Sequence, residues 1–94
     1  MVPRHARRKQ VLEHIINHGG ITRAYALAVF HVQNLAHVVM ELRRMGWRIR
    51  TTVFKREDGV RVVLYYITDI DVHFGLFLGR LYTNEDGTYG AYFS

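Results

Sequence analysis

The fold is decided by the stretch from residue 21 to residue 49, ITRAYALAVFHVQNLAHVVMELRRMGWRI. Thr22 suits an N-cap, because its hydroxyl can accept a hydrogen bond from an unpaired backbone N–H in the first turn of a helix. We therefore expect a short helix over residues 23–30 and, after a connection that starts at His31, a second helix that Gly46 ends. Helical spacing directs a set of apolar side chains inward: Ala26, Leu27, Phe30, Leu35, Ala36, Val39 and Leu42.

The residues on either side of this stretch predict one more helix and a β-hairpin. Residues 7–18 carry apolar side chains at the spacing of one helix face, and Gly19-Gly20 follow them. From Trp47 to Phe54 the apolar period changes to two, which is typical of a strand. The Asp58-Gly59 pair favours a hairpin turn, with its tip at residues 57–59, and a β-branched and aromatic strand follows over residues 60–67.

Residues 68–94 differ from the rest of the chain in composition. The last 21 residues contain six of the twelve aromatic residues, and Arg80 is their only Lys or Arg. We expect strands over 76–82 and 88–93 around a turn at 84–87, and we interpret Asp69 and Asp71 as a turn that leaves the first hairpin. The predicted fold is α+β, with three helices and a β-hairpin over residues 1–67 and a C-terminal β-hairpin extension over residues 68–94.

The charge of the chain is distributed unevenly. Residues 1–67 hold twelve Lys/Arg against four Asp/Glu, a net charge of +8, whereas residues 68–94 have a net charge of −3, which together give the overall +5. A basic body of this size suits a polyanion such as nucleic acid, because released counterions favour association. The alternative is a solvated surface that happens to be basic.

Several classes of protein are disfavoured by the sequence. The chain contains no cysteine, which excludes disulfides and thiol catalysis and fits a reducing cytosol. The longest apolar run, residues 24–30, is too short to span a bilayer, so we expect a cytoplasmic protein without a membrane partner. We find no catalytic constellation and expect no enzyme and no cofactor. His14 and His18 have a spacing that could hold zinc, but no third ligand is evident, so we expect no metal.

At this point the stretch from Ile21 to Ile49 resembles the winged helix-turn-helix domains of bacterial and bacteriophage regulators. The shared features are the Ile21-Thr22 opening, the Ala and Phe of the short helix, the Leu35-Ala36 start of the next helix and a Leu-Arg-basic-x-Gly-aromatic step into the hairpin. The resemblance implies a DNA-binding regulator, often phage-borne, in which the helix over residues 33–45 enters the major groove and the hairpin, or wing, touches the backbone or minor groove. Two departures are His31, where glycine is common in the turn, and Val38, on the side expected to face the groove.

The resemblance also implies the residues that would contact DNA. Four are expected to face base edges: Gln33, Asn34, His37 and Glu41. Ten are expected to contact the DNA backbone: Arg4, Arg7, Arg8, Lys9, Thr22, Arg23, Arg44, Lys55, Arg56 and Arg61. The alternative for the first set is an ordinary solvated helix face.

Two functions remain open. The first is a duplex-DNA-binding transcriptional regulator of a phage or bacterium, which we expect to be a homodimer through residues 74–93, unless the extension folds over the first helix and completes a monomer core. The second is a winged-helix scaffold that binds a protein partner, such as a phage-encoded inhibitor of a host machine. Val38, Glu41 and the acidic aromatic extension favour the second function.

Overall fold

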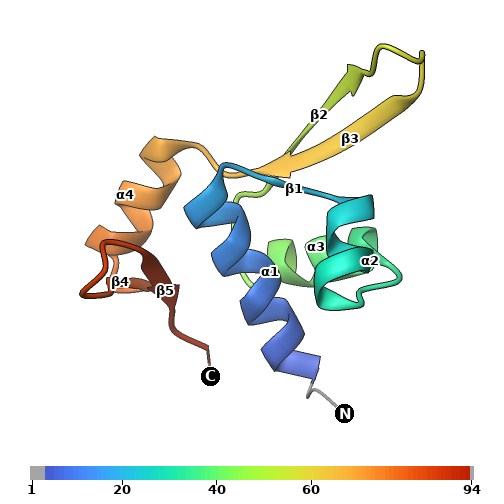
Figure 1. Cartoon of the computed structure of the whole chain (residues 1–94). Helices are drawn as coiled ribbons and strands as arrows, with labels where there is room; N and C mark the ends of the chain where they lie inside the picture. Colours follow the sequence, from blue (N-terminus) through green and yellow to red (C-terminus); the bar gives the residue numbers. More distant parts are fainter. Residues whose placement is uncertain (1–3, 94) are drawn as a thin grey trace.

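The computed structural model describes residues 4–93 of the chain, apart from the side chains of residues 4 and 5. In chain order the elements are α1 (Arg4–His18), β1 (Ile21–Thr22), α2 (Arg23–Phe30), α3 (Leu35–Arg44), β2 (Arg50–Lys55), β3 (Arg61–Tyr66), α4 (Asp69–Phe77), β4 (Leu81–Thr83) and β5 (Tyr89–Ala91). Helix α1 runs between α2 on one side and α4 on the other, and the β2–β3 wing projects away from the body (Figure 1). The predicted order of three helices followed by a hairpin is confirmed.

The two helices of the central motif begin at capping side chains. The Oγ1 of Thr22 accepts a hydrogen bond of 3.3 Å from the N–H of Tyr25, as predicted. The Oδ1 of Asn34 accepts one of 3.1 Å from the N–H of His37, so α3 begins at Leu35, two residues later than expected. Its helical residues therefore do not include Gln33.

The turn between α2 and α3 has the shape that usually calls for glycine. His31 adopts the left-handed conformation, with φ of 57°, and is the one non-glycine residue with positive φ among residues 4–93. The N–H of Val32 donates to the carbonyl of Ala26 at 3.1 Å, and Arg7 Nη1 donates to the carbonyl of His31 at 3.3 Å. Histidine adopts the left-handed region more readily than a β-branched residue does. The two hydrogen bonds hold the turn in this conformation.

The wing belongs to a three-stranded antiparallel sheet in the order β1-β3-β2. Strand β1 was not predicted, because two residues carry no periodicity; its Ile21 pairs with Tyr65 of β3. Strand β2 begins at Arg50 rather than at Trp47, because Trp47 and Ile49 are buried in the core before the wing leaves the body. The predicted tip at residues 57–59 is confirmed, with Gly59 at φ of 85°.

The core includes residues from both parts of the sequence. Its buried side chains are Val11, Leu12, Ile15, Ile21, Ala26, Val32, Leu35, Val39, Leu42, Trp47, Ile49, Ile67, Val72, Leu81 and Ala91. The inward prediction was wrong for Leu27, which is 49 % exposed, and for Ala36, which is also exposed. Helix α2 is only two turns long, and Ala26 is its only fully buried residue. The apolar face that packs against the core is therefore narrower than we expected.

The prediction for residues 68–81 was wrong. Asp69 begins helix α4 instead of a turn, and the Oγ1 of Thr68 caps this helix by accepting a hydrogen bond from the N–H of Asp71 at 3.3 Å. Both aspartates lie in the first turn, where negative charge is favourable to the helix dipole. The strand expected from residue 76 begins only at Leu81, although the turn at residues 84–87 is confirmed by the pairing of β4 with β5. Phe77 was expected in this strand, but it is the last residue of α4, which also carries Phe74.

The C-terminal hairpin lies against α1. The Asn17 side chain bonds the backbone of Tyr89 in both directions, accepting from its N–H at 2.7 Å and donating to its carbonyl at 2.9 Å. Glu13 Oε2 accepts from the N–H of Ala91 at 2.8 Å. The extension therefore folds over the first helix, which is the intramolecular arrangement that we had set against a homodimer.

Candidate nucleic-acid interface

The outward face of α3 is defined by the residues opposite its buried side. Leu35, Val39 and Leu42 face the core. The exposed residues of α3 and of the turn before it are Gln33, Asn34, Ala36, His37, Met40, Arg43 and Arg44. Met40, which is 38 % exposed, was missed by the sequence analysis, although its position half a turn from Val39 and Leu42 could have placed it on this face.

Three of the four residues expected to face bases have partners within the chain: Asn34, His37 and Glu41. Asn34 uses its Oδ1 to cap α3. Glu41 is half-buried, and its carboxylate lies 3.3 Å from Arg8 Nη1 of α1 and 3.3 Å from His37 Nε2. Glu41 thus joins α3 to α1 at the flank of the helix. Gln33 and His37 lie on the outward side.

Val38 does not lie on the outward face of α3. Its side chain is partly buried and packs against the core. Val38 is therefore a packing residue. Its sequence-based interpretation, as an apolar residue on the side that faces the groove, was wrong.

The basic residues expected at the start of the chain also serve the fold. Arg7 bonds the turn carbonyl of His31, and Arg8 pairs with Glu41. Lys9 lines a shallow hollow on the other side of α1, together with Tyr82 and residues 91–93. The side chain of Arg4 lies outside the described residues. These contacts place Arg7 and Arg8 between α1 and the helix-turn-helix motif.

The wing presents two cations directly opposite each other. Lys55 of β2 is the register partner of Arg61 of β3, and both side chains are exposed. Side chains alternate between the faces of a strand, so these two share one face with Thr51. Arg43 Nη2 of α3 donates to Thr51 Oγ1 at 2.9 Å, and its Nε donates to the carbonyl of Ile49 at 2.8 Å. The face with Lys55 and Arg61 is therefore the one on the α3 side.

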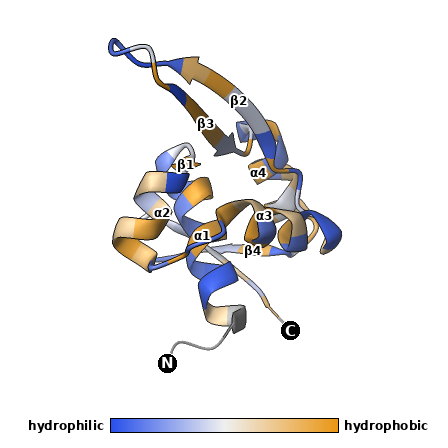
Figure 2. Ribbon diagram, turned by 90° about the vertical axis from the view of Figure 1, so that its right-hand side faces the viewer, coloured by the Kyte–Doolittle hydropathy of each residue, from blue (hydrophilic) through white to orange (hydrophobic). Residues whose placement is uncertain are grey.

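The third basic residue of the wing has a different partner. Arg56 forms a bidentate ion pair with Asp58 inside the turn. The hydrogen bonds that Asp58 accepts from the Arg56 guanidinium and from the N–H of Val60 lower the pKa of its carboxyl group. The tip of the wing is hydrophilic, whereas apolar residues lie along its strands (Figure 2). Arg56 thus carries less unpaired charge to the surface than Lys55 or Arg61.

The remaining expected contacts lie at helix ends. Arg23 is exposed in the first turn of α2, directly after the Thr22 cap, and Arg44 is exposed at the end of α3. Phosphate is suited by the free N–H groups at the start of α2 and by the two cations, whereas the end of α3 itself presents carbonyl oxygens. Thr22 is half-buried and uses its hydroxyl as the cap, so it offers backbone groups more readily than its side chain.

The two closely spaced histidines pack against aromatic rings. The His14 ring stacks on His18, with centroids 4.5 Å apart, and on Tyr25, with centroids 4.4 Å apart. Desolvation and the neighbouring His18 lower the pKa of His14. Within residues 4–93, no three His, Cys, Asp or Glu side chains gather as metal ligands would. No helix in the described part of the chain combines the length and the apolar character of a membrane span.

The three helices, the capped turn and the wing together define a winged helix-turn-helix domain. Residues 6–69 match the family model described as a winged helix-turn-helix domain, so the chain belongs to this family, and the resemblance found in the sequence is confirmed. Membership indicates DNA binding. Searches of the curated proteins and of the solved structures found no match to the chain.

Proposed function

We propose that the chain is a cytoplasmic, non-enzymatic regulator of transcription in a bacterium or bacteriophage, which binds duplex DNA with α3 in the major groove and the wing on the backbone. The observation that carries the proposal is the direct opposition of Lys55 and Arg61 on the α3 side of the wing. Two like charges in register destabilise a hairpin. A phosphate backbone lying against both of them would remove that cost.

The outward face of α3 is suited to base contacts. Gln33 has an amide that can pair bidentately with adenine, and His37 lies one turn along the same side. Met40 adds an apolar contact surface, and Arg44 adds a cation at the end of the helix. The family's DNA-binding character supports this assignment, and Asn34 and Glu41 then serve to position α3, which carries His37 and directly follows the turn with Gln33.

We also propose that the chain binds as a homodimer through residues 74–93. A twofold protein places two recognition helices on two half-sites of the duplex. Of the features that favoured a protein-binding scaffold instead, Val38 packs against the core and Glu41 pairs with Arg8, so neither supports it further. The extension still exposes large apolar side chains, and a second copy of the chain would bury them.

The experiment is a fluorescence-anisotropy titration of labelled duplex DNA at several salt concentrations. We expect affinity to fall steeply with salt, with a slope of about −0.9 per neutralised phosphate in a plot of log K against log salt. The double change Lys55→Ala and Arg61→Ala should reduce that slope by about two, because each cation contacts one phosphate.

Arg48→Ala is the matched control. Arg48 is exposed and lines a cavity beside α4, so its loss removes the same charge away from the Lys55–Arg61 pair. Its slope should stay near that of the parent. Absence of binding at low salt, or an equal loss in Arg48→Ala and in the wing variant, would contradict the proposed DNA interface.

A further inference from the structure

Helix α4 is apolar on two opposite faces. Val72 and Gly75 face the core, and Leu76 packs against it. Four apolar residues at the spacing of one helix face point the other way, and we call them the α4 stripe: Ile70, Phe74, Phe77 and Leu78. Their exposed fractions are 79 %, 59 %, 84 % and 54 %. A helix with apolar side chains on two opposite faces is expected to be covered on both of them.

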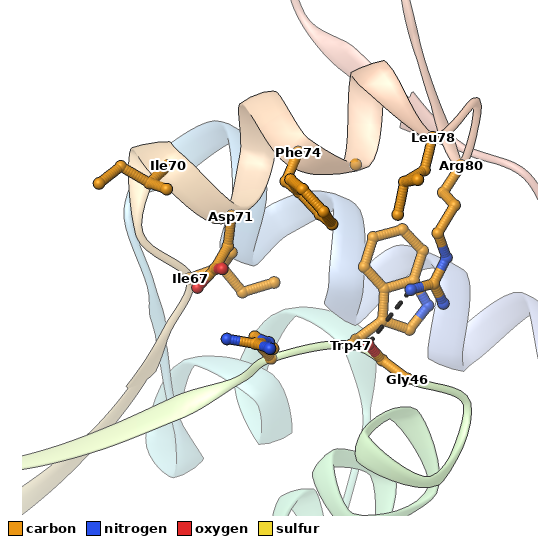
Figure 3. Close-up of a pocket in the computed structure, with 10 residues that line it drawn as sticks. Gly46, Trp47, Ile67, Ile70, Asp71, Phe74, Leu78 and Arg80 are labelled. Atoms are coloured by element: carbon orange, nitrogen blue, oxygen red, sulfur yellow. Dashed lines mark hydrogen bonds between the residues drawn. The ribbon is translucent and has the colours of Figure 1, made fainter.

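A cavity of about 430 Å³ lies beside the α4 stripe. Ile70, Phe74 and Leu78 form its upper wall in Figure 3, and Trp47 with Arg80 forms the opposite side. The cavity gives the stripe a concave flank with room for apolar side chains from a partner. The stripe and the cavity together make one surface, which a single occupant could cover.

The arrangement of the stripe favours a second copy of this chain as that occupant. Ile70 and Leu78 are each four residues from Phe74, so these three residues of the stripe are symmetric about Phe74. If two α4 helices pack antiparallel, Phe74 meets Phe74, and Ile70 of each copy lies opposite Leu78 of the other. These three positions are complementary to themselves, as a twofold interface requires. Phe77, whose counterpart is Asp71, then lies at the edge of the contact.

The helix dipoles favour the antiparallel orientation. Antiparallel pairing of two α4 helices opposes their dipoles. Asp69 is exposed in the first turn of α4, whereas Asp71 Oδ2 lies 3.7 Å from Arg50 Nη2. Arg80 is held within the chain by Trp47 and two backbone carbonyls. Parallel pairing would place the acidic turns side by side.

The area of the stripe sets an upper limit on what the stripe alone can bury. Its exposed side chains offer on the order of 600 Å² per copy, since an aromatic side chain presents roughly 150–250 Å² and Ile and Leu somewhat less. Complete burial of both stripes would reach on the order of 1,200 Å², the lower end of the range for stable complexes. Tyr92, which is 62 % exposed, is a further apolar side chain of the extension.

We propose that the α4 stripe is the homodimer interface, with two α4 helices antiparallel and Phe74 near the twofold axis. This specifies the homodimer of the proposed function and rests on it. Within residues 74–93 the contact is placed at Phe74, Phe77 and Leu78, and it extends to Ile70. The β4–β5 hairpin is instead bonded to α1 within each copy. Helix α4 lies on the opposite side of α1 from α2 (Figure 1). Pairing through α4 therefore leaves the central motif uncovered.

Sedimentation equilibrium of the full chain without DNA tests the proposal. We expect a dimer at micromolar concentration and, for Phe77→Asp, a dissociation constant raised at least about tenfold, as for the loss of an anchor residue. Leu27→Asp is the matched control, because Leu27 is an exposed apolar residue of α2. A monomeric parent, or equal dissociation constants for Phe77→Asp and the parent, would overturn the proposal.

A second variant tests the axis and does not depend on weakening the dimer. The chain has no cysteine, so Phe74→Cys introduces a single thiol, which should form a covalent dimer on mild oxidation. Leu27→Cys should form no covalent dimer under the same conditions. Equal cross-linking of the two variants would overturn the assignment of Phe74 to the axis.

DNA binding is measured separately by anisotropy, so the two proposals can fail independently. A dimer that binds no duplex would contradict the proposed function and keep the α4 interface. A chain that binds duplex DNA but sediments as a monomer would overturn the α4 interface and keep DNA binding.

Discussion

The guanidinium of Arg80 lies over the ring of Trp47, 4.2 Å from the ring centroid. The same group donates from Nη1 to the carbonyl of Gly46 at 3.2 Å and from Nη2 to the carbonyl of Met45 at 2.7 Å. Figure 3 shows the arginine reaching from beyond α4 to Trp47 and Gly46, between α3 and the wing. One side chain therefore connects the C-terminal extension to carbonyls just after the candidate recognition helix.

Arg80→Ala should lower the free energy of unfolding by about 1–3 kcal/mol, because it removes the ring contact and two charge-assisted hydrogen bonds. Arg80→Lys keeps the charge but lacks the planar fork, so an intermediate loss is expected. Urea denaturation followed by circular dichroism measures both. Equal stability of Arg80→Ala and the parent would show that the contact contributes nothing.

Changes at Asn34 and Gln33 should separate a capping residue from a base-reading residue. Asn34→Ala should cost about 1 kcal/mol of stability, and Asn34→Asp should restore most of it, because aspartate also caps helices. Gln33→Ala and His37→Ala should instead reduce the discrimination between cognate and random duplex, by roughly 1–3 kcal/mol for a lost bidentate contact. Thermal unfolding and competition anisotropy give the two readouts. If both Gln33→Ala and His37→Ala discriminate cognate from random duplex as well as the parent does, these residues do not make the base contacts proposed for α3.

Lys55→Glu should stabilise the wing and weaken DNA binding at the same time. The substitution converts a like-charge pair with Arg61 into an opposite-charge pair, which favours the hairpin by about 0.2–1 kcal/mol. It also places a negative charge where a phosphate is expected. Chemical denaturation and anisotropy on the same sample check the two directions, and Lys55→Gln is the neutral control. A Lys55→Glu protein that binds duplex as tightly as the parent would place the phosphate elsewhere.

Stability should fall as pH decreases below neutral, partly through His14. Desolvation and the charge of His18 hold the pKa of His14 below its ordinary value of 6.5. The folded chain therefore binds fewer protons than the unfolded chain as the pH falls through 6.5, so this contribution is present above that pH and is lost as pH falls through the folded pKa.

His14→Gln should flatten the dependence of the unfolding free energy on pH in that interval. His73→Gln, at an exposed histidine of α4, is the matched control and should keep the parent's slope. Identical pH profiles for His14→Gln and the parent would show that another group is responsible.

The predictions that held depend on residues close together in the sequence. The cap at Thr22 and the tip at Gly59 were each predicted from a local pattern, and each is present. Helix α4 was missed because Phe74 and Phe77 are common in strands, and the cap at Thr68 was not considered. Leu27 was wrongly predicted to be buried. The helical period shows which face of α2 is apolar, but not how much of that face the neighbouring elements cover.

The sequence by itself determined the winged helix-turn-helix fold, since helix periods, caps and turn residues act over a few positions. Only the tertiary structure decided what each polar side chain does. Glu41 and Arg8 are 33 residues apart and meet because α1 packs beside α3, and Asn17 bonds Tyr89 across 72 residues. Such pairings depend on how whole elements pack, which no local spacing encodes. For the same reason the sequence did not show that Val38 packs against the core and that Met40 is exposed on the outward face of α3.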